Sequence, residues 1–158
     1  MFKLAAAGIL TLIASTAAMA QTATQTVTFQ VDAINQISVA GAVSLDINSA
    51  IAGSAPTSVA SSVSSWAVTT NQTGAKITGS LAVAMPAGVT LSANLAPAPG
   101  ATSAGLKALT TTPVDLVTTI TKLNAGGLGL TYQLDATAAA GVVTSSTRVV
   151  TYTITGGV

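Results

Sequence analysis

The side chains on which most enzyme and metal sites depend are missing from this sequence. It has no His and no Cys, so it cannot form a Ser–His or Cys–His nucleophile pair, and zinc lacks its usual ligands. Glu is also absent, and the few Asp residues are too scattered for a calcium loop. A paired-carboxylate hydrolase would need two of those Asp residues to meet in the fold. We therefore predict no catalytic, cofactor-binding or metal-binding residues, and a protein that is not an enzyme.

Several short motifs resemble functional sites only superficially. Thr73-Gly-Ala-Lys76 and Thr119-Ile-Thr-Lys122 have the spacing of an S-x-x-K motif, but Thr stands in place of the Ser. Gly126-Gly-Leu-Gly129 lacks the spacing of a nucleotide-binding loop, and we expect it to be a turn between strands. Asn71-Gln-Thr73 matches an N-glycosylation sequon, which matters only in a host with that machinery.

Aromatic residues, which a carbohydrate-binding surface would use, are few. Phe29, Trp66, Tyr132 and Tyr152 each lie in a segment where apolar and polar residues alternate, which predicts that they pack in a core. Trp66 separates the two possibilities, because it follows a Ser-rich stretch. A buried Trp66 would favour a structural role, whereas an exposed Trp66 beside one of the Tyr residues would favour carbohydrate binding.

Hydrophobic periodicity predicts strands rather than helices. Val and Thr are abundant and favour a pleated, half-buried surface. Between Ala23 and Val39, apolar residues occupy most odd positions and polar residues most even positions, as in a strand with one buried face. This run is longer than an ordinary strand. We expect it to break near Asp32–Asn35 into two strands, or its start to project as an arm.

Similar alternation elsewhere predicts an all-β fold, an antiparallel β-sandwich of about eight short strands. Turns are expected at Met85–Gly88 and Asn124–Gly127. Asn48–Ser62 and Ala96–Thr112 contain Gly and Pro and are expected to be irregular. The other predicted strands are Ser44–Ile47, Ser64–Thr70, Lys76–Met85, Val89–Leu95, Val114–Leu123, Leu128–Ala136 and Arg148–Thr155.

Residues Met1–Ala20 have the layout of a secretory signal peptide. Lys3 supplies a positive charge, Leu4–Ile13 is an apolar run too short to cross a membrane, and Ala18-Met-Ala20 is a cleavage site. The alternative is an uncleaved N-terminal anchor. We predict cleavage after Ala20 and a mature chain, residues 21–158, that forms a single β-sandwich domain. The predicted location is secreted, extracellular or at the cell surface, with periplasmic transit in a Gram-negative host.

The charge of the mature chain is balanced. Loss of Lys3 with the signal peptide leaves four basic and four acidic residues. The chain has no basic stripe for nucleic acid and no polybasic patch for anionic lipid. A surface with so little charge opposes association weakly. We therefore expect self-association or attachment to other surface proteins, with no nucleic-acid partner and no membrane span after signal cleavage.

Two segments resemble a known group of proteins. Thr22–Val39 is a Thr-rich strand directly after the signal peptide, and the chain ends with Leu134-Asp-Ala136, Ala139-Ala-Gly141 and Val149-Val-Thr-Tyr-Thr-Ile154. This combination is similar to secreted spore-coat-protein-U-like domains and related bacterial surface β-sandwiches, which include subunits of chaperone–usher pili. The resemblance implies an immunoglobulin-like sandwich on a bacterial surface, polymerised by strand donation. Many such pilus subunits have a disulfide that this chain lacks, and the resemblance assigns no functional residues.

These observations predict a secreted, non-enzymatic structural or adhesive surface protein. The more specific hypothesis is a fibre or pilus subunit that assembles by strand addition. The alternative is a cell-surface carbohydrate-binding module. The assembly hypothesis is that Thr22–Val31 pairs with the sheet edge of a neighbouring subunit. The competing interpretation is that the same residues form the first strand of their own sandwich.

Overall fold

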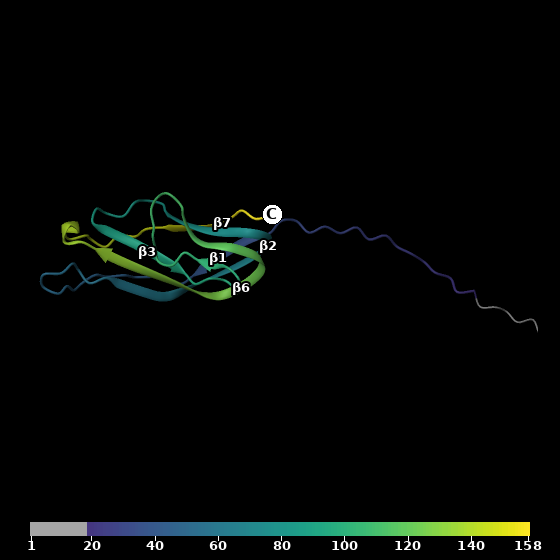
Figure 1. The fold of residues 1–158 in the computed structure, drawn as a ribbon, viewed down its shortest axis with the longest axis horizontal. Helices are drawn as coiled ribbons and strands as arrows, with labels where there is room; N and C mark the ends of the chain where they lie inside the picture. Colours follow the sequence, from purple (N-terminus) through teal and green to yellow (C-terminus); the bar gives the residue numbers. More distant parts are fainter. Residues whose placement is uncertain (1–18) are drawn as a thin grey trace, which may run out of the picture. The chain divides into compact units, whose positions relative to one another are not determined.

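The structure is a computed structural model that describes residues 19–158 (Figure 1). The chain divides into two units, one ending at Val31 and the other spanning Asp32–Val158. The predicted signal peptide lies, apart from its last two residues, outside the described residues. Within the described part of the chain, no helix is long and apolar enough to cross a membrane.

The second unit is an antiparallel sheet of seven strands. The prediction of an all-β antiparallel sandwich is therefore confirmed. Apart from one short 3-10 turn, η1 (Ala138–Ala140), residues 32–158 contain no helix. The strands are β1 (Asn35–Ala40), β2 (Val59–Leu81), β3 (Val89–Leu95), β4 (Thr102–Ser103), β5 (Lys107–Ala108), β6 (Val114–Ala136) and β7 (Val150–Thr155).

Strands β2 and β6 each run through both layers of the sandwich. They pair with each other over most of their length, with register shifts between Thr70 and Ile77 where the chain bends. Gly74, Thr119 and Lys122 have positive φ angles in this region. Figure 1 shows β6 curving around this end of the molecule, which we call the closed end. The closed end is therefore made by continuous strands rather than by loops.

The remaining strands flank this central pair. In one layer, β1 pairs with residues 65–70 of β2, and β3 pairs with residues 130–136 of β6 and with β5. In the other layer, β7 pairs with residues 76–81 of β2, and β4 pairs with residues 117–118 of β6. Because β1 and β7 both pair with β2, on the side away from β6, they form the same edge of the sandwich.

The predicted strand boundaries differ from the structure where β2 and β6 are continuous. Ser64–Thr70 and the first part of Lys76–Met85 belong to the single strand β2. The turn predicted at Asn124–Gly127 is wrong, because Asn124 and Ala125 pair with Thr69 and Val68 inside β6. Glycines there are tolerated in a strand, and the bend falls earlier in β6, where Thr119 and Lys122 have positive φ angles.

Residues 19–34 belong to no strand and are exposed. The predicted strand over Ala23–Val39 therefore forms only in its last part, β1, and the break falls where it was expected. We call residues 21–31 the N-terminal arm. Its apolar side chains at Val27, Phe29 and Val31 are 72%, 88% and 76% exposed, so the apolar face predicted from the alternation is real but uncovered.

Candidate functional site

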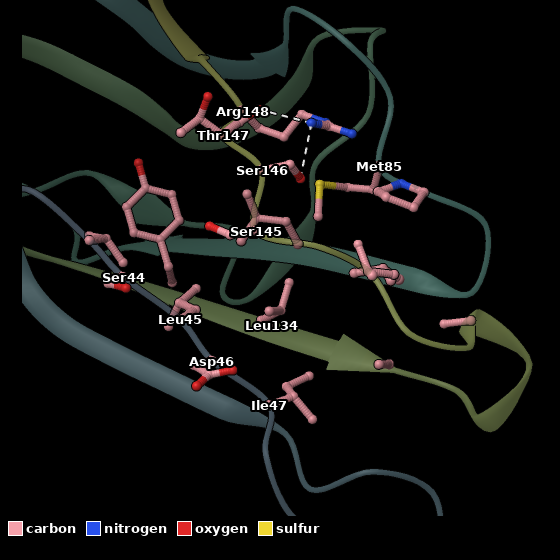
Figure 2. A pocket seen from close by; sticks show the side chains of 18 of the residues that line it. Ser44, Leu45, Asp46, Ile47, Met85, Leu134, Ser145, Ser146, Thr147 and Arg148 are labelled. Carbon is pink, nitrogen blue, oxygen red and sulfur yellow. Dashed lines mark hydrogen bonds between the residues drawn. The ribbon is translucent and has the colours of Figure 1, made fainter.

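A groove of about 1180 Å³ lies between the layers, along the edge that β1 and β7 form (Figure 2). It extends from Tyr152, near the middle of β7, to Ala136 and Gly141 at the end opposite the closed end. We call that end the open end. Figure 2 shows Leu45 and Leu134, from two different segments, reaching into the groove. The apolar side chains that line it are Val39, Val43, Leu45, Ile47, Met85, Val89, Leu91, Leu134, Val143 and Val150.

One wall of the groove is the segment that follows β1, residues 42–48. Val43, Leu45 and Ile47 are half-buried while the residues between them are exposed, which is the burial pattern of a strand. The segment nevertheless forms no main-chain hydrogen bond. The predicted strand Ser44–Ile47 is therefore wrong as a paired strand, although its residues alternate between half-buried and exposed.

Gly41 marks the point where this wall leaves β2. Its φ angle is 102°, and a Cβ atom there would lie 3.0 Å from Ser64 Cα. A side chain would be strained at this φ and would collide with the β2 backbone. Gly41 therefore lets the chain cross close to β2 and then turn away from it, which separates residues 42–48 from the sheet.

The opposite wall is the segment that precedes β7. Residues 142–148 form no hydrogen bond between main-chain groups, so the strand predicted to begin at Arg148 begins at Val150. The Arg148 guanidinium donates hydrogen bonds to the carbonyl oxygens of Ala84 (3.0 Å) and Thr147 (2.9 Å). Both walls of the groove thus present unpaired main-chain groups, which is the condition under which a sheet edge accepts another strand.

The groove is polar at its Tyr152 end. The Tyr152 hydroxyl donates a hydrogen bond to the Tyr132 hydroxyl, with 2.6 Å between the oxygens. Burial raises the pKa of both Tyr132 and Tyr152 above the ordinary value. Ser64 also lines the groove and is only 3% exposed, and its Oγ has no hydrogen-bond partner among residues 19–158. Since buried hydroxyl groups are almost always hydrogen-bonded, Ser64 requires an explanation.

A second group of contacts fixes the start of β1 at the closed end. Asn71 Oδ1 accepts a hydrogen bond from Ile34 N (2.8 Å), and Asn71 Nδ2 donates one to Asp32 O (2.7 Å). Both ends of the amide of the predicted sequon are therefore used within the fold. They hold the main chain of residues 32–34 against the bend in β2, so the N-terminal arm begins at the closed end.

The remaining sequence motifs have structural explanations. Lys76 Nζ lies 2.9 Å from Asp115 Oδ1 in a half-exposed ion pair, a type of contact that contributes little stability. Lys122 and Thr119 belong to the bend in β6. Gly126–Gly129, predicted to be a turn, lies inside β6. None of these residues lines the groove.

The aromatic residues follow the core prediction with one exception. Trp66 is 1% exposed, and its Nε1 donates a hydrogen bond to Ala96 O at 3.2 Å. Tyr132 is 9% exposed and Tyr152 is half-buried. Phe29 is 88% exposed, so its predicted place in the core is wrong, because residues 19–34 belong to no strand.

The groove was not predicted from the sequence. Its signal in the sequence is the series of apolar residues at odd positions from Ile37 to Ile47, which is interrupted only by Gly41. No family model, curated protein or solved structure matches this chain. The resemblance of Thr22–Val39 and of the C-terminal segments to spore-coat-protein-U-like domains therefore stays a prediction.

Proposed function

We propose that this protein is a secreted, non-enzymatic structural subunit of the cell surface that assembles into fibres by strand addition. The observation that carries the proposal is the groove, whose two walls have unpaired main-chain groups, in a chain that also has an exposed arm with an apolar face. In the assembly, the N-terminal arm of one copy lies in the groove of the next. Main-chain hydrogen bonds supply affinity and alternate side chains supply specificity.

The arm is long enough to span the groove. Residues 42–48 offer about 23 Å of edge, and residues 21–31 span about 36 Å when extended, at ~3.3 Å per residue. The exposed Val27, Phe29 and Val31 share one face of an extended arm. That face would cover Leu45 and Leu134 across the groove. Removing this much apolar surface from water favours association.

The direction of the chain is compatible with insertion into another copy. Strand β7 runs from the open end to the closed end, and Asn71 holds the base of the arm at the closed end. An arm folding back into its own groove would run parallel to β7. An arm inserted antiparallel to β7 of another copy ends at that copy's open end, which leaves space for the donor subunit beyond it.

Two further features support an assembling subunit over a carbohydrate-binding module. The mature chain has no formal net charge to keep copies apart. Trp66, on which the carbohydrate-binding alternative depended, is buried among core residues rather than displayed. In the adhesive version of this role, the exposed faces of such a fibre would bind to other surfaces.

Deletion of the arm tests the proposal. The mature chain, residues 21–158, is expected to form species of high mass in light scattering and filaments in electron microscopy. A variant that lacks residues 21–31 is expected to be a monomer with an unchanged sheet spectrum in circular dichroism. An intact mature chain that stays monomeric at high concentration, or a deletion that simply unfolds the domain, would contradict the proposal.

Substitutions within the arm provide the matched control. Replacing Val27, Phe29 and Val31 together by Thr removes the apolar face and is expected to prevent assembly. Replacing Thr24, Thr26 and Thr28 together by Ser leaves that face intact and is expected to preserve assembly.

A further inference from the structure

Ser64 is a buried polar group whose partner is not found in the described part of the chain. Its Oγ has no hydrogen-bond partner although the residue is 3% exposed, and it lines the groove beside Gly41. An unpaired buried hydroxyl costs free energy. A ligand that fills this part of the groove and brings a hydrogen-bonding group would remove that cost.

The arm carries such a group on the matching face. The odd positions that present Val27, Phe29 and Val31 also present Gln25. An amide entering an apolar groove is unfavourable unless it finds a hydrogen-bond partner. Burial of either Gln25 of the arm or Ser64 of the groove alone therefore costs free energy, because its polar group has no partner. Burial of both together allows them to hydrogen-bond to each other.

The two residues also lie at similar depths in the groove. In an antiparallel alignment that places Val31 level with Val59 at the open end, Gln25, six residues earlier, lies about 20 Å deeper. On the acceptor, β2 begins at the open end with Val59, and Ser64 lies five residues further, about 17 Å deep. The difference is about the length of one residue.

We propose that Gln25 of one copy hydrogen-bonds to Ser64 of the next copy, and that this pair fixes the register of the inserted arm. The inference rests on the proposed assembly by strand addition. A Gln amide can both donate to and accept from a hydroxyl. A shift of two residues keeps the same face inward but places Ala23 or Val27 against Ser64, which leaves the hydroxyl unpaired, and a shift of one residue reverses the faces.

A double-mutant cycle on the mature chain tests the pair. The variants are Ser64→Ala, Gln25→Leu and their combination, and the measurement is the protein concentration at half-assembly, taken from light scattering. In the protein that keeps Ser64, the Gln25→Leu substitution leaves the Ser64 hydroxyl without a partner and should weaken assembly. In the Ser64→Ala background, the same substitution replaces an unpaired Gln25 amide by an apolar side chain and should not weaken assembly. The effect of Gln25→Leu is expected to differ about tenfold between the two backgrounds.

The controls use neighbouring residues that should not couple. Ser62→Ala changes an exposed residue of the same strand, and Thr26→Val changes the opposite face of the arm; both are expected to combine additively with Gln25→Leu and Ser64→Ala. Circular dichroism of each dilute monomer checks that the sheet is intact. A mature chain that never assembles would overturn the proposed function itself. A chain that assembles with additive effects of Ser64→Ala and Gln25→Leu would overturn the register pair and leave strand addition standing.

Discussion

The tyrosine pair in the groove links residue chemistry to stability. Tyr132 and Tyr152 have folded-state pKa values above the ordinary value of 10.0, chiefly because burial disfavours the phenolate. A raised folded-state pKa contributes stability that is fully present below the unfolded pKa and is lost as the pH rises through the folded pKa. The free energy of unfolding should therefore be flat just below pH 10 and should fall above it.

Substitution of the pair by Phe checks this expectation. Below pH 10, Tyr152→Phe removes the hydrogen bond to Tyr132 and should cost about 1 kcal/mol. Above pH 10, the variant with both Tyr132→Phe and Tyr152→Phe should lose much of the alkaline decline. Urea denaturation of dilute monomer on either side of pH 10 measures both effects. An alkaline decline of the same size in the double variant would show that other groups cause it.

At the scale of elements, alternation predicted which side chains face inward but not which segments pair. β3 was predicted with its observed bounds, and Val43, Leu45 and Ile47 are half-buried while the residues between them are exposed. Pairing depends on the partner strand, and no local pattern shows that Gly41 turns the chain away from β2. Within residues 32–158, the two walls of the groove pair with no strand, so local alternation predicted a strand at Ser44–Ile47 where the structure has an unpaired wall.

The long strands were missed for a related reason. Asn124–Gly127 has the composition of a turn, but its main-chain groups pair with β2. Pairing with a strand more than fifty residues away in sequence overrides local preference there. The buried position of Trp66 could be predicted, because its alternation with Ser64 and Val68 marks one inward face.

The unpaired walls give a prediction at the same scale. In the monomer, the amides of residues 42–48 and 142–148 have no main-chain partner and should exchange with deuterium rapidly, because unpaired exposed amides lack protection. In the assembled protein, insertion of an arm should protect amides in both segments. Hydrogen-exchange mass spectrometry of monomer and assembly measures the change. The amides of β3, paired with β6 in the monomer, serve as the internal control and should change little.

At the scale of the whole molecule, the proposed insertion makes the assembly polar. The base of each arm is held at the closed end by Asn71, and the antiparallel arm places the donor beyond the open end of the acceptor. Successive subunits should therefore meet closed end to open end. The absence of Cys from the chain allows this geometry to be examined with introduced cysteines and no background reaction.

Two exposed positions mark the ends of the molecule. Thr73 lies at the closed end, where its main chain pairs with Val158, and Ser54 lies in the loop before β2, at the open end. In assembled protein treated with a bifunctional thiol reagent, the variant with both Thr73→Cys and Ser54→Cys should form a ladder of covalent oligomers. Either substitution alone should give few cross-links, because equivalent positions lie a whole subunit apart in a head-to-tail fibre. Efficient dimers from Ser54→Cys alone would indicate that open ends meet each other, as in a two-fold symmetric dimer, which is closed and cannot extend into a fibre through that contact.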